Sequence, residues 1–325
     1  MKNALFILAL LPLFVYPAAA GNRADVNADR AVNAADSVCL ANILAGNIDA
    51  SEFNLENVVV VAPQGGDFTD PADAADWVAE QNPSPHNRFV ILVTPGEYEL
   101  TRGIWLPSYT TLRGYGRKNS IIMRSGGTAS PPYGAVVVLN STHESAIEDL
   151  RLTKGSGGST NTATIYIFSS SVLIENCDVS LGSTVEYGVA IYSLGLSYIN
   201  IFGTSIYASG NYAPADLANS VAGVYMESLA AYAGAEIEVI NSEIWALNDS
   251  VASEVHKYAY AVVLNVDVTD KRLVAKYTYL RTHSNSAADY YYLYRNVSGS
   301  AQLYFCYSMG ATNSESNLSR IMCHP

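Results

Sequence analysis

The chain has 325 residues, of which 49% are hydrophobic and 23 are tyrosines, and its formal net charge is −12 at pH 7. A nucleic-acid partner is not expected, because proteins that bind phosphates present clustered Lys and Arg rather than an excess of acid. Four cysteines are too few for a disulfide scaffold at this length, and the many tyrosines favour a packed β protein.

Residues 1–20 are predicted to be a signal peptide. Lys2 precedes an apolar run over residues 4–16, and residues 18–20 are the small alanines that signal peptidase requires. The apolar run is shorter than the roughly 20 residues that cross a bilayer, and no later segment is apolar enough, so no membrane span is expected. The sequence therefore predicts a secreted protein, extracellular or periplasmic.

Residues 25–36 have the sequence DVNADRAVNAAD, which places side-chain oxygens at positions 1, 3, 5, 9 and 12 of a twelve-residue loop. This is the spacing of an EF-hand-like calcium site, in which a backbone carbonyl at position 7 completes the set. The predicted ligands of one Ca²⁺ are Asp25, Asn27, Asp29, Ala31, Asn33 and Asp36. An apolar stripe of Leu40, Ile43 and Leu44 predicts a helix after the loop. The alternative is a polar turn in which Asp36 caps that helix.

Residues 21–50 resemble one half of a dockerin module, which has the same loop followed by a Leu/Ile helix. The resemblance implies calcium binding and, for a complete module, a cohesin-like partner. This chain departs from the pattern because it holds a single repeat and has Arg30 where the loop normally has Gly. Calcium binding is therefore the stronger expectation, and docking to a cohesin-like partner the weaker one.

The segment from residue 59 to about 124 predicts the start of a solenoid. Residues 73–81 suit a short helix, whose Ala and Trp77 face can cover the open end of a coil stack. The motif GGDFT precedes the helix in the sequence, and the motifs PGEY and LRGYGR follow it. They resemble the opening of pectinesterase-type proteins in the pectin-lyase-like superfamily. The resemblance implies a right-handed parallel β-helix and specifies fold more than activity.

Five later segments repeat one alternating pattern, starting at residues 172, 199, 237, 273 and 301. A column of small residues follows their inward positions, formed by Cys177, Thr204, Ser242, Thr278 and Cys306. Successive members of this column are 27, 38, 36 and 28 residues apart, so one coil takes about 27 residues and two coils carry insertions. A second element, predicted to be in phase with the first, begins at Gly134, Gly188 and Gly223. An all-β, right-handed parallel β-helix is therefore expected over residues 51–325.

The stacking of the coils also limits which cysteines can form a disulfide. Cys177 and Cys306 lie four coils apart in the column, about 19 Å at a strand spacing of ~4.8 Å. A disulfide joins Cα atoms less than about 7 Å apart, so this pair is excluded. A Cys306–Cys323 bridge is the one that the sequence allows.

The resemblance to pectinesterases implies two catalytic Asp residues, supported by Gln and Arg. Where the family has Gln-Asp-Thr, this chain has residues 183–185, Ser-Thr-Val, and where the second Asp is expected it has residues 210–212, Gly-Asn-Tyr. Ester hydrolysis by that mechanism is not expected, and the catalytic residues of any other reaction are unknown. Glu175 and Asp178 are expected on the outer face of one strand, as part of a solvated surface.

The two insertions, about residues 208–222 and 246–262, leave equivalent positions on adjacent coils and are expected to wall a groove. The candidate groove residues are Tyr212, Asp216, Trp245, Asp249, Glu254 and His256. Aromatic faces and carboxylates there favour a polysaccharide ligand. The alternative for the groove is that Trp245 packs outside a sheet and the loops are ordinary insertions. A polysaccharide lyase or glycoside hydrolase, with two carboxylates roughly 5–10 Å apart, and a structural or adhesive surface solenoid are the competing functions.

Overall fold

The computed structural model describes residues 57–322 with internal gaps. The residues outside the description are 1–56, 126–131, 156–161, 183–187, 211–220, 229–235, 249–257, 267–271, 285–289, 297–299, 305–306, 310–317 and 323–325. The predicted signal peptide, the calcium loop and the Cys306–Cys323 pair lie outside the described residues. No helix among the described residues is long and apolar enough to cross a membrane.

The described chain forms three sheets. Sheet 1 consists of β1 (Asn57–Val61), β2 (Phe89–Val93), β5 (Thr110–Arg113), β8 (Ser145–Glu148), β11 (Ser171–Glu175), β14 (Tyr198–Phe202), β17 (Glu236–Ile240), β20 (Arg272–Lys276), β23 (Ser300–Tyr304) and β25 (Leu318–Met322). Sheet 2 consists of β3 (Gly96–Glu99), β6 (Ser120–Arg124), β9 (Arg151–Lys154), β12 (Asp178–Leu181), β15 (Ser205–Gly210), β18 (Glu243–Asn248), β21 (Tyr279–Ser284) and β24 (Tyr307–Met309). Sheet 3 consists of β4 (Ile104–Trp105), β7 (Val137–Asn140), β10 (Thr162–Phe168), β13 (Gly188–Leu194), β16 (Val221–Ser228), β19 (Tyr258–Val266) and β22 (Tyr290–Asn296).

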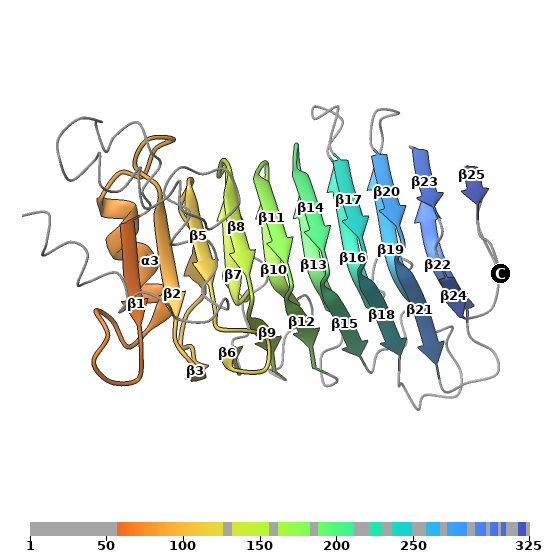
Figure 1. The fold of residues 1–325 in the computed structure, drawn as a ribbon. Helices are drawn as coiled ribbons and strands as arrows, with labels where there is room; N and C mark the ends of the chain where they lie inside the picture. Colours follow the sequence, from red (N-terminus) through yellow and green to blue (C-terminus); the bar gives the residue numbers. More distant parts are fainter. Residues whose placement is uncertain are drawn as a thin grey trace, which may run out of the picture. The chain divides into compact units, whose positions relative to one another are not determined.

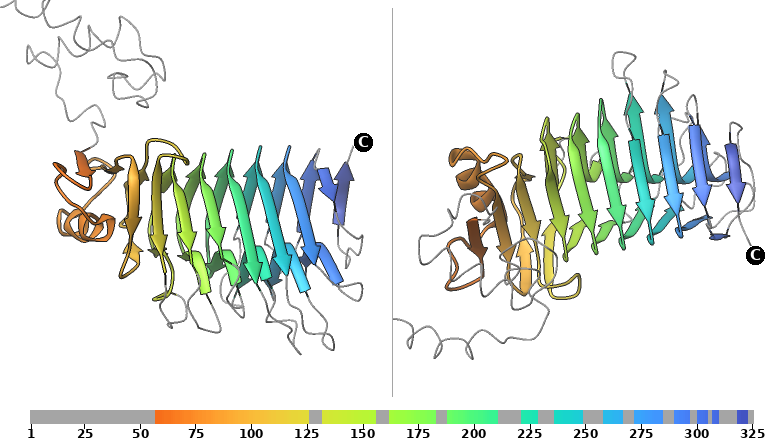
Figure 2. Two further views of the ribbon diagram at one scale, coloured as in Figure 1. Left: turned by 90° about the horizontal axis from the view of Figure 1, so that it is seen from below. Right: turned by 45° about the horizontal axis from the view of Figure 1, so that its top comes forward.

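The chain visits the three sheets in turn and pairs each strand in parallel with the strand one coil earlier. Thus β11, β12 and β13 pair with β14, β15 and β16 of the following coil. Figures 1 and 2 show these coils stacked in sequence order. The fold is therefore a parallel β-helix, as the repeats predict. Its right-handed winding stays a prediction, and this is the hand that almost all parallel crossovers take.

The strand register confirms the first predicted column. Val172 pairs with Ile199, Ile199 with Ile237, and Ile237 with Leu273. The side chains of the first three residues are at most 2% exposed and belong to one continuous apolar core. Burial of such β-branched and aliphatic residues along every coil supplies the main force that holds the solenoid together.

The second predicted column holds at two of its three positions. Val137 and Ile191, which are 54 residues apart, both pair with Ile165, so the elements that start at Gly134 and Gly188 are in phase. Val224, however, pairs with Ile191, which sets Gly223 two residues away from the predicted alignment with Gly188. A Cβ on Gly223 would lie 2.3 Å from a methyl group of Ile244, so this glycine is required by close packing in the core.

The turns from sheet 1 to sheet 2 use a left-handed residue to bend the chain sharply from one sheet into the next. The residues with positive φ at equivalent places in successive coils are Asp149, Asn176, Gly203, Asn241 and Tyr277, with φ between 49° and 57°. Asp, Asn and Gly adopt this conformation most readily, whereas a bulky aromatic residue does so rarely. Four of the five turns therefore follow local preference, and the turn at Tyr277 does not.

A ladder of buried hydroxyl groups follows each of these turns. The Cys177 amide donates to Thr204 Oγ1 at 3.2 Å, and the Thr204 amide donates to Ser242 Oγ at 3.2 Å. A second ladder runs at the turns from sheet 3 to sheet 1, where the Thr142 amide donates to Ser170 Oγ at 3.0 Å. Small polar residues in the columns thus satisfy backbone groups that a tight turn would leave buried without acceptors.

Helix α3 (Pro71–Glu80) corresponds to the capping helix expected at 73–81, and begins two residues earlier. Asp70 is its N-cap and accepts a hydrogen bond from the Ala72 amide at 2.7 Å, while Pro71 occupies the first turn. Its buried face is made of Ala and Val, and it contacts β1, β2 and β4. Trp77 lies at the rim, 39% exposed, with its ring near the rings of Phe68 and Phe89.

Candidate functional site

The structure supports the predicted placement of the two insertions but describes only one of the groove residues. Ala208 pairs with Ala246, where the insertions begin, and Val221 pairs with Ala259, where they end. The stems of the loops therefore lie on adjacent coils. Five of the groove candidates lie outside the described residues, namely Tyr212, Asp216, Asp249, Glu254 and His256.

Trp245, the sixth candidate, lies on the outer face of sheet 2. It is half-buried in β18 and pairs in register with Tyr207 of β15. The two rings are 5.9 Å apart and nearly perpendicular, an edge-to-face contact. This is the packing alternative considered from the sequence, in which the tryptophan covers the outside of a sheet.

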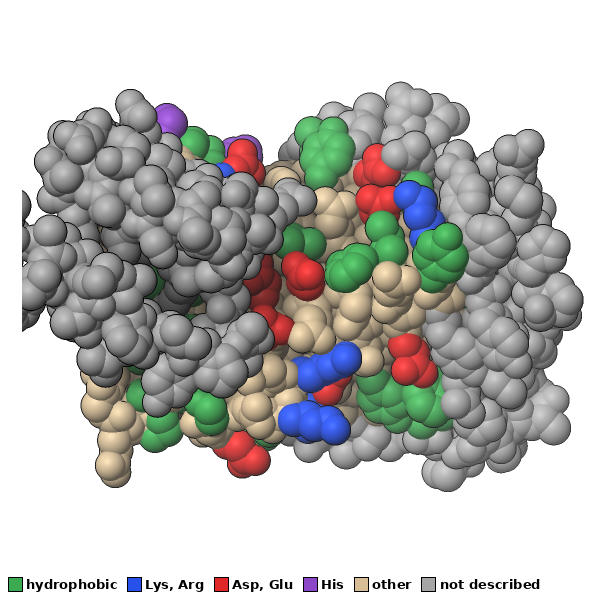
Figure 3. All heavy atoms as spheres, in the orientation of Figure 1, with side chains coloured by type: hydrophobic (Ala, Val, Ile, Leu, Met, Phe, Trp, Pro, Cys, Tyr) green, Lys and Arg blue, Asp and Glu red, His purple; other side chains and the backbone are tan. Residues whose placement is uncertain are grey.

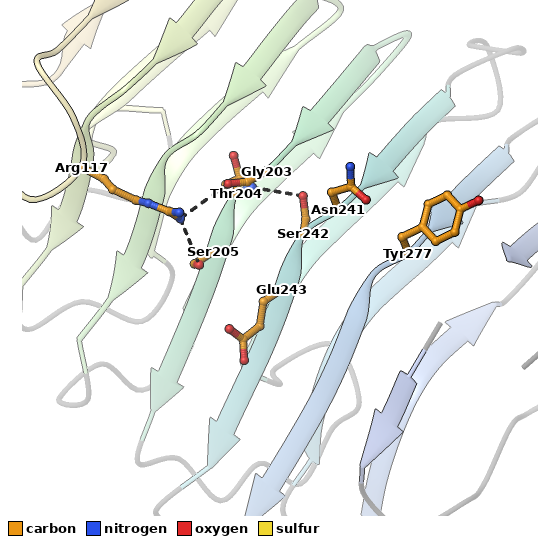
Figure 4. Close-up of a pocket in the computed structure, with 8 residues that line it drawn as sticks. All are labelled: Arg117, Gly203, Thr204, Ser205, Asn241, Ser242, Glu243 and Tyr277. Carbon is orange, nitrogen blue, oxygen red and sulfur yellow. Dashed lines mark hydrogen bonds between the residues drawn. The ribbon is translucent and has the colours of Figure 1, made fainter. Parts of the chain in front are cut away.

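The structure has a shallow depression of about 390 Å³ at the turns that connect sheet 1 to sheet 2. These successive turns form a ridge along the solenoid, and the depression lies on it. Its lining residues are Arg117, Gly203, Thr204, Ser205, Asn241, Ser242, Glu243 and Tyr277. Figure 4 shows that seven of them come from the turns of three successive coils, after β14, β17 and β20, with Tyr277 at one end and Arg117, which comes from an earlier coil, at the other. The depression is open to solvent, so a ligand would lie along it and would not be enclosed.

Small residues at the turns form the floor of the depression. A Cβ on Gly203 would meet only the Asn176 amide nitrogen, at 4.0 Å, so the space above this turn is open. Thr204 and Ser242 point their hydroxyls into the buried ladder, with exposures of 1% and 6%. The small residues that allow these turns to be tight therefore also leave the outer surface hollow at this place.

Arg117 reaches the depression from the loop between β5 and β6. This loop folds over the turn of the next coil, because the Gly116 amide donates to the Asp149 carbonyl at 2.7 Å. The Arg117 guanidinium then extends to the Ser205 hydroxyl and the Gly203 carbonyl, through Nη1, at 3.4 and 3.5 Å. These contacts are long for hydrogen bonds, so the guanidinium can donate to a ligand without losing a strong partner.

Asp178 lies between two arginines next to this end of the depression. Its carboxylate oxygens are 3.4 Å from Arg117 Nη1 and 3.2 Å from Arg151 Nη2. All three side chains are partly exposed, so the pairs fix geometry more than they add stability. Glu175 and Asp178 were predicted on one strand, which is wrong: they lie on β11 and β12, because the chain turns at Asn176.

Glu175 belongs to a separate acidic group on the outer face of sheet 1. It pairs in register with Glu148, which accepts a hydrogen bond from Arg113 Nε at 2.7 Å. Burial raises the pKa of Glu175, and the nearby charges of Glu148 and Asp149 raise it further. Among the described residues, no three or more His, Cys, Asp or Glu are arranged to hold a metal ion.

Exposed aromatic residues occur in and next to the lining of the depression, since Tyr277 lines it and Phe202 precedes the lining residue Gly203. Tyr277 is 63% exposed and Phe202 is 40% exposed, on coils two strands apart in sheet 1. Tyr198, at the other end of β14, is 47% exposed, so the outward positions of this strand carry two aromatic rings. Figure 3 shows hydrophobic, acidic and basic side chains intermingled on the face that it presents.

A third aromatic group lies on the outer face of sheet 3. The rings of Tyr166, Tyr192 and Tyr225 stack with centroid distances of 5.7 and 5.4 Å and interplanar angles of 14° and 6°. The Tyr192 hydroxyl donates to Glu227, and burial together with this carboxylate raises the pKa of Tyr192. Because these rings cover one another, the stack strengthens the sheet and offers a ligand few free ring faces.

The sequence reasoning missed Arg117, Phe202 and Tyr277. Phe202 carried a signal, because it alternates with the inward residues Ile199 and Ile201 and must face solvent. Arg117 carried none, since its contacts lie 61 to 88 residues further along the chain.

No protein-family model and no curated protein match the chain. Solved structures with a similar fold include Escherichia coli YbhC, at 13% identity and a TM-score of 0.47, over 78% of this chain and 84% of that one. Pectin methylesterase PemA from Erwinia chrysanthemi is similar at 11% identity and a TM-score of 0.42, over 80% and 91%. The catalytic domain of a GH87 α-1,3-glucanase is similar at 11% identity and a TM-score of 0.32, over 75% and 45%. The fold assignment rests on the strand pairing described above.

Proposed function

We propose that this protein is secreted and binds extracellular polysaccharide on the ridge between sheets 1 and 2, without the pectinesterase catalytic residues. The observation that carries this proposal is a polar depression with two exposed rings, Tyr277, which lines it, and Phe202, which directly precedes the lining residue Gly203. Aromatic faces pack against the apolar faces of sugar rings, and nearby polar groups bond sugar hydroxyls. An open surface of this kind suits a long polymer better than a small molecule.

The backbone at Tyr277 supports a role for its ring. Tyr277 has φ of 51°, at a turn position where the equivalent coils have Asp149, Asn176, Gly203 and Asn241. A left-handed tyrosine costs free energy that Asn or Gly would not, and Tyr277 is 63% exposed to solvent. An exposed aromatic ring held at this position, where it lines the depression, is suited to contact a ligand there.

The test is retardation of the mature protein in native gels that contain soluble polysaccharides, followed by calorimetry with each polymer that retards it. A Phe202→Ala, Tyr277→Ala double variant is expected to lose at least about tenfold in affinity, since two stacking contacts of about 1 kcal/mol or more are removed. Tyr133→Ala is the matched control, because Tyr133 is 67% exposed and packs against Trp105, a residue of sheet 3. Equal affinity of the double variant and the wild type would overturn the proposal.

The same screen distinguishes binding from catalysis. Reducing or unsaturated ends released from a bound polymer would identify a hydrolase or a lyase and replace the binding function. No retardation by any polymer would leave a structural or adhesive solenoid as the better description.

We further propose that residues 21–50 bind one Ca²⁺ through the loop at 25–36. The proposal rests on the oxygen spacing of the sequence alone, which matches five side-chain positions of an EF-hand-like loop. A cohesin-like partner is a secondary proposal, tested by adding calcium and a cohesin module to the mature protein in a pull-down.

A further inference from the structure

We infer that the depression selects an uncharged polysaccharide, whose chain lies across the strands along the stacking direction of the coils. This inference rests on the proposed polysaccharide binding and adds the class and the orientation of the ligand. It is carried by the charges that line the depression, by their hydrogen-bonding chemistry and by the spacing of the two exposed rings.

The charges of the site do not favour a polyanion. The lining contains one cation, Arg117, and one anion, Glu243. Arg117 and Arg151 share one carboxylate, Asp178, at 3.4 and 3.2 Å, so these three groups carry one net positive charge. Glu243 balances that charge, so an acidic polymer would meet no net positive charge at the depression. The chain as a whole has a net charge of −12, which repels polyanions at long range.

The hydrogen-bonding groups demand a ligand that both donates and accepts. Arg117 can only donate, Glu243 can only accept when ionised, and the Asn241 amide does both. Figure 4 shows Arg117 beside Gly203 and Ser205, and Asn241 and Glu243 on either side of Ser242, in the same depression. A sugar hydroxyl is both donor and acceptor, so neighbouring hydroxyls of a neutral sugar can satisfy all three groups. A carboxylate offers no donor to Glu243.

The spacing of the rings sets the orientation. Phe202 ends β14 and Tyr277 follows β20, and these strands are separated by β17 alone. At ~4.8 Å per strand, the two coils are about 10 Å apart. A polymer that contacts both rings must therefore run across the strands, from the coil of Phe202 to the coil of Tyr277, and pass over the turn at Asn241.

The experiment compares a neutral β-glucan, a neutral galactomannan and polygalacturonate with the wild-type mature protein, by affinity electrophoresis and calorimetry at low salt. At least one neutral polymer is expected to bind, and polygalacturonate is expected to bind at least about tenfold more weakly. Glu243→Lys should raise the affinity for polygalacturonate about tenfold at low salt, and added salt should remove this gain. Glu97→Lys changes the net charge equally at an exposed site outside the depression and is expected to change nothing.

The outcomes separate this inference from the proposed function. If polygalacturonate binds better than both neutral polymers and the Phe202→Ala, Tyr277→Ala variant loses it, the inference is wrong and polysaccharide binding stands. If no polysaccharide binds, both fail. An unchanged affinity of Glu243→Lys for polygalacturonate would also contradict the charge argument. Circular dichroism of each variant checks that the fold is retained; Glu97, Phe202 and Tyr277 are exposed and Glu243 is half-buried.

Discussion

Replacing Tyr277 by Asn is expected to stabilise the protein and to weaken its binding of polysaccharide. Tyr277 adopts φ of 51° at the turn after β20, where the preceding coil has Asn241 at φ of 49°. The left-handed conformation of a non-glycine residue costs roughly 1–2 kcal/mol of conformational free energy. The cost is smaller for Asn, because its side chain forms hydrogen bonds with the neighbouring backbone. The tyrosine ring is 63% exposed, so its removal loses little buried area.

The expected gain is about 1 kcal/mol in the free energy of unfolding. For a chain of this size, such a gain raises the thermal midpoint by about 2–4 °C. Urea unfolding followed by circular dichroism measures the free energy, and the native-gel assay with a bound polysaccharide measures function. Tyr277→Asn should therefore move the two readouts in opposite directions.

Gly203→Ala supplies the matched control for the backbone cost. Gly203 has φ of 57° at the equivalent turn, and an added Cβ would approach no heavy atom closer than 4.0 Å. Its substitution thus introduces the left-handed cost without a clash, and should lower stability by about 1 kcal/mol. If Tyr277→Asn destabilises the protein while Gly203→Ala leaves it unchanged, the turn imposes no left-handed cost and the argument from strain fails.

Three further predictions concern the core, a buried charge and the calcium loop. Ser242→Ala should lower the free energy of unfolding by about 1–3 kcal/mol, because the buried Thr204 amide loses its acceptor; a change below about 0.5 kcal/mol, as is usual for exposed side chains, would refute this. Lys154 is fully buried, and burial and the nearby Arg124 charge lower its pKa, so stability should rise with pH from that lowered value toward the ordinary value of 10.5. Lys154→Met should flatten this rise in urea midpoints measured across alkaline pH, and an unchanged slope would contradict it. Calorimetry should detect one calcium site in the mature protein and none in Asp25→Ala. No heat of calcium binding in the wild type would contradict the calcium proposal.

Much of the fold could be predicted from the sequence, because each coil places the same chemistry at the same inward positions. The register from Val172 through Ile199 to Ile237 follows from this repetition. Gly223 was misaligned because the preceding insertion hides how many residues the coil contains, and an even shift leaves the facing of every side chain unchanged. The turn at Asn176 was missed because one left-handed residue bends the chain from sheet 1 into sheet 2 without a Gly or Pro to mark it.

The candidate site could be predicted only in part. The outward ring of Phe202 follows from alternation along β14, and so could have been found. Asn176, Asn241 and Gly203 mark a turn type, against which Tyr277 becomes recognisable as an exception only after the register is known. The position of Arg117 over a turn two or three coils away depends on how its loop folds back, and no local pattern encodes that path.

The hydroxyl ladders give the solenoid a direction. The Cys177 amide donates a hydrogen bond to Thr204, and the Thr204 amide donates one to Ser242. At both turns the acceptor is therefore supplied by the coil that follows. Removing whole coils from the C-terminal end therefore leaves one amide of this ladder without its acceptor at the new boundary, where water can satisfy it. Removing one whole inner coil would bring equivalent turns together, because Ser242 offers the same kind of acceptor as Thr204. Changes in length by whole coils are accordingly compatible with this ladder, whereas a change by part of a coil would break it.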